Sequence, residues 1–543
     1  MTTLAAAPGF LHTTRTASEF AGTGQMLRLF LRRDRIIAPL WSLLIGLMPA
    51  LQIVSIKDLY ATQQQLDSFA ATTAASPALL AMYGPVFNSS LGSIGTWKAG
   101  AMYSMIAIAT VLTVIRHTRV EEETGRAELV GATSIGRFAG LTGALLLTFG
   151  ASVVAGIACT ASLLATDLPA AGSFAWGLAL AASGIVWAAV AAVAAQLSNG
   201  ARIARGVALG TLGAAFAVRA VGDAGNGVLS WFSPLGWCLQ IRPYAGERWW
   251  VLVPLAAVGA GATLLAYQLL RTRDLGAGLL AERPGPATAG GALAGPVGLA
   301  WRLQRGSMLG WTVGFGLYGL LIGGAVNSIG GMLDDSGTLQ DVVTSMGGST
   351  DLEKSFIAYA ITMLAAAAAA YSVSSVLRLH EEENTGRAET VLAAAVGRTG
   401  FVASHLLFAI AGPAVALLVS GLGIGVVWGA TDGDVVGKVG DSLAAVAVQL
   451  PAVWVITAIA LLLFGAAPKY ATLAWAVLSA TVVIMLLGSL GTFPQWLMDL
   501  VPFVHPPKLP GGAFDIVPVA WLHAVAAAGI VVGLIAFRRR DLR

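Results

Sequence analysis

Two short segments of the sequence carry glutamate and arginine in nearly the same pattern. The first reads EEETGRAELVGATSIGR from Glu121 to Arg137, and the second reads EENTGRAETVLAAAVGR from Glu382 to Arg398. Aligned without gaps, they share two leading glutamates, the block TGRAE and the closing Gly-Arg. Such side chains can pair within one chain or bind a partner protein through charge-assisted hydrogen bonds. A single copy could be explained as an ordinary solvated loop. Two nearly identical copies make this explanation weak.

Motifs for covalent or hydrolytic chemistry are missing from the sequence. No lysine lies in a GxxxxGK[ST] phosphate loop, so the chain cannot bind ATP by that route. The segment HEEEN, from His380 to Asn384, starts like a zinc-protease helix but has Asn where the second histidine is required. A GxSxG nucleophile elbow does not occur either. We therefore nominate no catalytic or metal-binding residue and expect this chain to bind no cofactor.

The composition indicates that lipid is the main solvent of the chain. Of its 543 residues, 56% are hydrophobic, 11% are charged and 66 are glycine, and the mean hydropathy is +0.77. No water-soluble domain with this composition would stay in solution. The apolar runs are continuous, whereas the strands of an outer-membrane barrel alternate apolar and polar residues. The sequence therefore predicts an all-α polytopic membrane protein.

Twelve apolar runs are long enough to cross the hydrocarbon core, which takes a helix of about 20 residues. They lie near residues 36–56, 99–115, 138–164, 174–197, 203–221, 250–270, 307–327, 356–377, 401–429, 442–466, 470–490 and 517–537.

The positions of the basic residues predict the orientation of these spans. If the N-terminus is cytosolic, most of the 32 Lys and Arg residues fall in inward segments. The outward segments then hold only Lys57, Lys98, Arg219, Arg242, Arg248, Lys354, Lys438 and Lys508. This bias places both termini in the cytosol.

The spans divide into two halves of six. Residues 1–35 are expected to form a cytosolic N-terminal arm, in which GQMLRLFLRRDR resembles an interfacial helix. The first half covers 36–270. The Pro/Gly-rich segment 271–306 is a cytosolic linker that ends in a second such helix, GLAWRLQR. The second half covers 307–543, and both interfacial segments could brace the charged motifs.

Each charged motif follows the second span of its half. Thr124-Gly125 and Thr385-Gly386 should break the helix. A short second helix then precedes the return to the membrane. Because each half contains an even number of spans, the repeat is parallel, with a pseudo-two-fold axis along the membrane normal. The substrate route would then lie between the halves.

These motifs, with SPLGW from Ser233 to Trp237 and RPYAGERWW from Arg242 to Trp250, resemble the permeases of type-two ATP-binding-cassette exporters. The resemblance covers both halves and is to the fused two-half actinobacterial kind, described as tetronasin or polyketide-antibiotic exporters. It implies a permease in the bacterial plasma membrane. Its substrates would be hydrophobic or amphiphilic compounds such as drugs, antibiotics or lipids, moved outward.

In that family the loop after the second span is a coupling helix that docks on an ATPase subunit. The residues of this sequence that match it are Glu122, Gly125, Arg126, Glu128, Arg137, Glu383, Gly386, Arg387, Glu389 and Arg398. The resemblance further implies two copies of a cytosolic ATPase subunit, which would bind the ATP and Mg. The other expected partners are membrane lipid and a hydrophobic small-molecule substrate. The scattered basic residues do not indicate a nucleic-acid partner.

Arg242, Tyr244, Trp249 and Trp250 lie at the predicted outer end of the sixth span. Such aromatic residues typically anchor a helix at the membrane interface. An extracellular gate is the other interpretation. The second half offers only PFVHPPKLPGG, residues 502–512, as a counterpart, so the two outer surfaces are expected to differ.

An ion-coupled secondary transporter is the main alternative, since such proteins can also have six plus six spans in parallel repeats. This class needs ionisable groups within the membrane. The candidates are Arg219 and Asp223 near a helix end, and His405 near a cytosolic entrance. A membrane-embedded enzyme would need a cluster of acids or histidines at one face, which the sequence does not contain.

Overall fold

The computed structural model describes residues 19–198, 200–274, 276–279, 287–288, 290–293, 295–334, 351–394, 396–488 and 494–541, with the backbone alone at 327–334, 352 and 486–488. The start of the predicted N-terminal arm, the middle of the predicted linker and the end of the predicted eleventh span lie outside these ranges.

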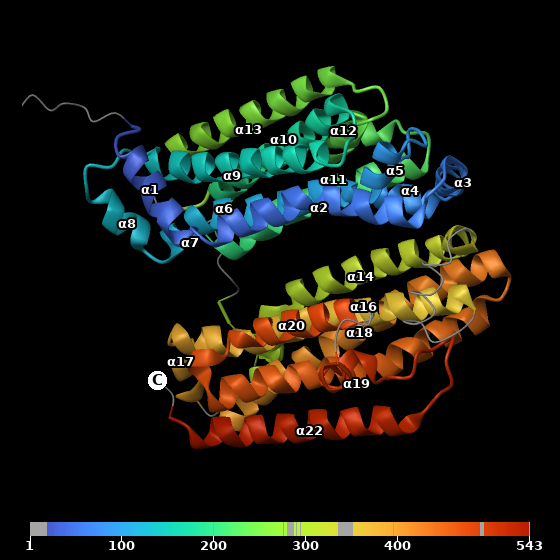
Figure 1. The fold of residues 1–543 in the computed structure, drawn as a ribbon. Coiled ribbons are helices and arrows are strands. Elements are labelled where there is room, and N and C mark those ends of the chain that lie inside the picture. Colours follow the sequence, from blue (N-terminus) through green and yellow to red (C-terminus); the bar gives the residue numbers. More distant parts are fainter. Residues whose placement is uncertain are drawn as a thin grey trace, which may run out of the picture. The chain divides into compact units, whose positions relative to one another are not determined.

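The chain forms two compact units (Figure 1). Unit 1 comprises residues 1–58 and 83–283, and unit 2 comprises residues 59–82 and 284–543. The segment 59–82, which precedes the second predicted span, thus belongs to unit 2, where α3 packs on α14.

Each unit is a bundle of helices. In unit 1 they are α1 (Thr23–Arg33), α2 (Ile37–Leu59), α5 (Leu91–Trp97), α6 (Ala101–His117), α7 (Arg119–Glu123), α8 (Arg126–Gly131), α9 (Ala139–Leu164), α10 (Ala170–Leu197), α11 (Ala201–Ala224), α12 (Pro234–Gln240) and α13 (Leu252–Thr272). In unit 2 they are α3 (Gln63–Ala74), α4 (Pro77–Tyr83), α14 (Pro296–Asp334), α16 (Leu352–Asn384), α17 (Arg387–Leu392), α18 (Arg398–Asp432), α19 (Val435–Ala466), α20 (Leu473–Gly488), α21 (Gln495–Met498) and α22 (Ile516–Arg539). The described ranges contain no strand, which confirms the all-helical prediction.

Eleven helices in the described part of the chain are long and apolar enough to cross a membrane. They coincide with eleven of the twelve predicted spans. The remaining one, near 470–490, falls on α20, which has 16 residues. At 1.5 Å per residue the described part of this helix covers about 24 Å of a hydrocarbon core about 30 Å thick. The chain is therefore a multi-pass membrane protein, and the count of twelve crossings stays a prediction.

Small residues let the central helices approach closely. In unit 1, α10 packs against α6, α9, α11, α12 and α13. A Cβ on Gly156 of α9 would lie 2.5 Å from the carbonyl oxygen of Gly177 on α10. In unit 2, a Cβ on Gly319 of α14 would lie 2.3 Å from the Ser420 carbonyl oxygen on α18. Backbone contact of this kind is how helices gain packing energy in a membrane, where no hydrophobic force drives them together.

Candidate functional site

Each unit contains a sharp helical elbow at the place where the repeated motif predicts one. In the first elbow, residues 119–137, α7 and α8 meet at Gly125, whose φ is 71°. In the second elbow, residues 380–398, α16 and α17 meet at Gly386, whose φ is 72°. In both, the glycine N–H donates to a glutamate carbonyl at 3.0 Å. Glycine ends a helix in this way because it has no Cβ to clash in the left-handed region.

Alanine at Gly125 or Gly386 should strain the elbow. No atom lies within 4 Å of an added Cβ at either glycine, so the penalty comes from the backbone conformation alone. We expect each substitution to lower the free energy of unfolding by about 1–2 kcal/mol. Thermal melting of the purified variants measures this effect. Gly140→Ala is the matched control, because this helical glycine also has open space around it and should melt at or above the wild-type temperature.

The second glutamate of each motif binds an arginine that directly follows the last helix of its unit. Glu122 lies 2.6 Å from Arg273, which follows α13. Glu383 accepts two hydrogen bonds, of 2.6 and 2.5 Å, from Arg540, which follows α22. All four side chains are at least 85% buried, which makes these ion pairs costly to break from one side. Each elbow is therefore tied to the last helix of its own unit.

The final arginine of each motif makes a second tie to the same helix end. Arg137 Nε donates to the Leu270 carbonyl at 3.1 Å, and its Nη2 donates to the carbonyl of Arg273. Arg398 donates in the same way to two carbonyls at the end of α22, at 3.2 and 2.9 Å. Carbonyls in the last turn of a helix lack intrahelical partners and carry partial negative charge, which a guanidinium satisfies. Through these bonds the two arginines position the elbows within their own units.

The middle of each motif is exposed. The side chains of Arg126 and Arg387 are 57% and 56% exposed. Their neighbours within the elbow are Glu121, at 3.5 Å from Arg126, and Glu382, at 3.0 Å from Arg387. Because more than half of each guanidinium is exposed, solvent weakens these pairs, and a partner's carboxylates could replace them. The exposed acidic residues beside them are Glu128 and Glu389.

The first elbow is also braced by α1, as the sequence predicts for this segment. Arg33 at the end of α1 lies 2.8 Å from Glu121. Just before α1, the Ala21 carbonyl accepts a hydrogen bond of 2.8 Å from Gly136 N–H of the elbow, and the Glu19 carbonyl accepts one of 2.9 Å from Phe138 N–H, directly after it. The segment GLAWRLQR, expected to be a separate interfacial helix, instead forms the first turns of the continuous helix α14. The elbows thus share their inner ties but differ in their bracing.

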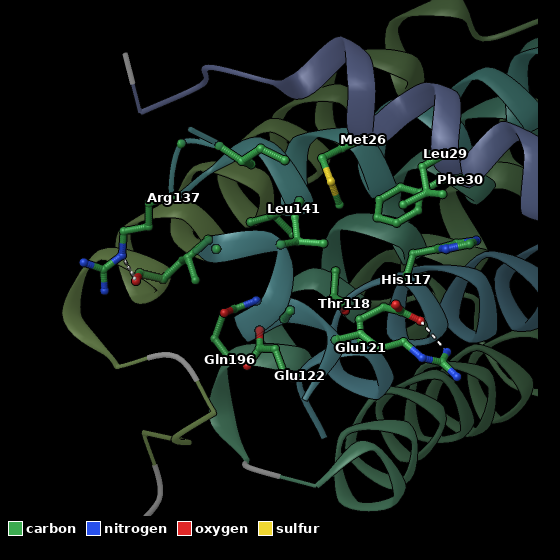
Figure 2. A pocket seen from close by; sticks show the side chains of 18 of the residues that line it. Met26, Leu29, Phe30, His117, Thr118, Glu121, Glu122, Arg137, Leu141 and Gln196 are labelled. Atoms are coloured by element: carbon green, nitrogen blue, oxygen red, sulfur yellow. Dashed lines mark hydrogen bonds and ion pairs between the residues drawn. The ribbon is translucent and has the colours of Figure 1, made fainter. Parts of the chain in front are cut away.

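A cavity of about 410 Å³ lies between α1 and the first elbow (Figure 2). Met26, Leu29 and Phe30 of α1 line one side, and the carboxylates of Glu121 and Glu122 lie on the other. Both carboxylates are already paired with arginines. The lining also contains Arg137 and Asp274, so charged groups of both signs lie at this cavity.

The sequence prediction missed the arginines that hold the elbows in place, namely Arg119, Arg273 and Arg540. Arg119 is fully buried and binds Glu122. A signal for the other two exists, because an Arg-Asp-Leu triplet begins at Arg273 and again at Arg540, each time after the last span of a half. In the sequence alone, Arg273 and Arg540 look like ordinary basic residues at the cytosolic end of a span. Only the folded chain shows that each reaches a glutamate of the elbow.

The loop that contains Arg242 and Tyr244 lies at the end of unit 1 remote from the elbow. Its Tyr244 side chain is buried between neighbouring helices as a wedge. Tyr244 Oη lies 2.9 Å from Ser173 Oγ, and the Tyr244 carbonyl accepts a hydrogen bond of 2.9 Å from Asn88. Burial raises the pKa of Tyr244 to about 12, although the hydrogen bond with Ser173 opposes the rise. Arg242 and Tyr244 have φ values of 55° and 61°, a region that side chains other than glycine rarely occupy. Backbone strain of this kind persists where the surroundings fix the conformation.

Of the other predicted residues of this loop, the two tryptophans are exposed and Arg242 is half-buried. Trp249 and Trp250 are 42% and 58% exposed, and Trp250 stacks on Trp231 with ring centroids 5.5 Å apart. The Arg242 guanidinium lies over the Phe87 ring at 4.3 Å. Of the four predicted residues, Tyr244 is buried, Arg242 packs on Phe87, and Trp249 and Trp250 are exposed.

Alanine at Gly172 should displace the Tyr244 wedge. A Cβ at Gly172 would lie 2.1 Å from Tyr244 Cδ1, and a Cβ at Gly92 would lie 2.6 Å from Cγ of the same ring. We expect Gly172→Ala to destabilise unit 1 by about 1–3 kcal/mol through overpacking. Thermal melting is the measurement, and Gly150→Ala is the control because nothing lies within 4 Å of its added Cβ. Equal melting temperatures for the two variants would contradict the wedge.

The ionisable residues considered for ion coupling already have partners within their own unit. Arg219 lies 3.2 Å from Asp223, which also accepts a hydrogen bond of 2.6 Å from Ser230. His405 Nδ1 lies 3.2 Å from the side-chain amide of Gln304. Among the described residues, no group of three or more His, Cys, Asp or Glu side chains could hold a metal ion. This arrangement favours structural roles for these residues.

The fold and the elbows define the class of the protein: a multi-pass helical membrane protein with one charged elbow in each of two units. A family model described as "Multidrug efflux system permease Rv1217c, C-terminal domain" matches residues 293–538. The chain is 55% identical over 527 residues to the "Multidrug efflux system permease protein Rv1217c" of Mycobacterium tuberculosis (strain ATCC 25618 / H37Rv). This similarity covers 97% of the chain and 96% of the relative. The chain belongs to the family of this multidrug efflux permease.

Proposed function

We propose that the chain is the permease subunit of an ATP-binding-cassette exporter, moving hydrophobic or amphiphilic compounds out across the bacterial plasma membrane. Two copies of a cytosolic ATPase subunit dock on the two elbows and bind the ATP and Mg. The observation that carries this proposal is the repeated elbow, an exposed arginine on a short helix that is tied at its base to the unit behind it. The relative's name, multidrug efflux system permease, supports export as the direction.

The construction of the elbow suits the transmission of force. Its base is held by buried ion pairs of Glu122 and Glu383, whereas Arg126 and Arg387 are exposed. A partner that binds the exposed helix therefore pulls on the last helix of the unit through the base. A conformational switch must be driven by differential binding, here by ATP-dependent closure of the partners.

The inward position of both elbows, and of both termini, follows from the distribution of basic residues. The elbow motif of each half lies in a predicted inward segment, and Arg538 and Arg539 end α22 in the last one. The amphipathic α1 would lie along the cytosolic surface of the membrane.

Transport by inverted native-membrane vesicles distinguishes this proposal from ion-coupled transport. Vesicles containing the chain should take up ethidium when ATP and Mg are added, more than vesicles without it. Vanadate should stop the uptake, and a protonophore should leave it unchanged. Uptake that a protonophore abolishes and vanadate spares would instead establish the ion-coupled transporter.

A further inference from the structure

The side of α1 that faces away from the rest of unit 1 is basic. Arg28 and Arg32 lie four positions apart, so they share one face of the helix, and Arg35 lies two positions beyond its end. All three residues are exposed, and in the described part of the chain none of their side chains has an ion pair or a hydrogen bond. Residues 1–18 contain no acidic residue and one further arginine, so they cannot supply the counter-charge. This surface of α1 is therefore a cluster of uncompensated positive charge.

Large apolar side chains lie among these arginines in the sequence and are exposed as well. They are Leu31 on α1, and Ile36 and Ile37 at the entrance to the first membrane span. Because α2 begins at Ile37, the arginines lie within a few residues of the point where the chain enters the hydrocarbon. Basic and apolar residues interleaved at this depth match the headgroups of a lipid leaflet and the acyl chains just below them.

The opposite side of α1 is held firmly by the rest of unit 1. Met26 and Phe30 are buried against α9. Asp34, which is buried directly after α1, pairs with Arg116 and lies 2.9 Å from His117 Nε2 at the end of α6. The arginines are thus presented by a fixed helix, and a ligand that binds them does not have to order that helix first.

The matching segment of unit 2 carries a weaker form of this surface. The first turns of α14 hold two exposed arginines, Arg302 and Arg305. Attraction to a charged membrane surface grows with the number of basic residues beside it. Unit 1 is therefore the stronger of the two sites.

We propose that α1 is a binding site for the headgroups of anionic phospholipids, in which Arg28, Arg32 and Arg35 hold the phosphate while Leu31 and Ile36 contact the acyl chains. A basic cluster directly beside a membrane span attracts anionic lipid, and a guanidinium can donate two hydrogen bonds to one phosphate. A protein partner on the same face would have to cover apolar side chains at the entrance to the span, which favours lipid as the occupant. The inference rests on the proposed function for the side of the membrane on which α1 lies, and adds to it a lipid ligand beside the first elbow.

Lipid retention by the purified chain tests this site. The chain is placed in nanodiscs made of equal parts of phosphatidylglycerol and phosphatidylcholine, and native mass spectrometry counts the lipids of each kind that stay bound. The wild type should retain an excess of phosphatidylglycerol. The triple variant Arg28→Gln, Arg32→Gln and Arg35→Gln should lower the ratio of phosphatidylglycerol to phosphatidylcholine by about tenfold or more. Because no ATPase is present, this result does not depend on the proposed export.

A second triple variant removes the same charge from three separate helix ends. Arg205→Gln, Arg271→Gln and Arg305→Gln lie at exposed positions on α11, α13 and α14. This control should change the ratio by less than about twofold. Equal ratios for the wild type and the α1 variant would overturn the proposal. An equal fall in both variants would also overturn it, because total charge would then explain the binding.

Photo-crosslinking in native membranes identifies the occupant of this face. A benzophenone amino acid replaces Leu31 or, as a reference within the first span, the exposed Leu40 of α2. Both positions should form adducts with phospholipid, and those from position 31 should be enriched in anionic lipid relative to those from position 40. Adducts from position 31 with an ATPase subunit, or with another segment of this chain, would overturn the proposal. Lipid adducts from position 40 alone would do the same.

Discussion

Glu122→Ala should be the most destabilising single substitution at the elbows, lowering the free energy of unfolding by about 3–5 kcal/mol. The carboxylate is the shared partner of Arg119 and Arg273, whose side chains are 0% and 2% exposed. Removing it leaves two buried guanidiniums without their counter-charge. Glu383→Ala should have a smaller effect, about 2–3 kcal/mol, because Arg540 is more exposed and also stacks on Phe464 and Phe537.

The thermal melting temperatures of the purified proteins provide the measurement. They should fall in the order wild type, Glu383→Ala, Glu122→Ala. Glu128→Ala and Glu389→Ala remove exposed carboxylates from the same elbows. They should change the free energy of unfolding by less than about 0.5 kcal/mol and melt close to the wild type. If Glu122→Ala melted like Glu128→Ala, the buried tie between the elbow and α13 would be wrong.

The second large effect is expected from charge reversal at the exposed arginines. In the double variant Arg126→Glu and Arg387→Glu, each elbow presents an acid to the partner, and ethidium efflux from cells should fall by about tenfold or more. Thermal stability should change by less than about 1 kcal/mol, because each guanidinium is more than half exposed and solvent weakens its ion pair within the elbow.

Two controls separate loss of docking from loss of charge in general. Arg205→Glu reverses an exposed arginine at the start of α11, outside the elbows, and should leave efflux unchanged. The double substitution to lysine keeps the charge and should retain most of the efflux. Normal efflux by the double glutamate variant would show that Arg126 and Arg387 are not part of the docking surface.

The sequence predicts the helices and the elbows well, for physical reasons. Continuous apolar runs of the length of a membrane have few alternatives to a helix, and eleven of them are such helices in the structure. A Thr-Gly pair after three polar residues signals the helix break, and both glycines adopt the left-handed conformation. The run near 470–490 is apolar enough, but the structure describes only the 16 residues Leu473–Gly488 of α20 within it, and hydropathy alone does not show where a helix begins.

The roles within the elbow could not be separated from the sequence. Glu122 and Arg126 look equivalent in the motif, yet one is tied to Arg273, 151 positions further along the chain, and the other is exposed. Tyr244 reads as an interfacial aromatic residue, whereas it is buried against two glycines from other helices. Such pairings depend on which helix ends meet in space, and a single sequence does not encode that in any local pattern.

The most direct test of the elbow as a docking site is the amount of ATPase subunit that copurifies with the tagged chain from native membranes. Quantitative mass spectrometry should find two ATPase subunits for each copy of the wild-type chain. The double glutamate variant at Arg126 and Arg387 should retain about a tenth of that amount or less. An equal yield of ATPase subunit with both chains, or none with the wild type after gentle extraction, would contradict the account.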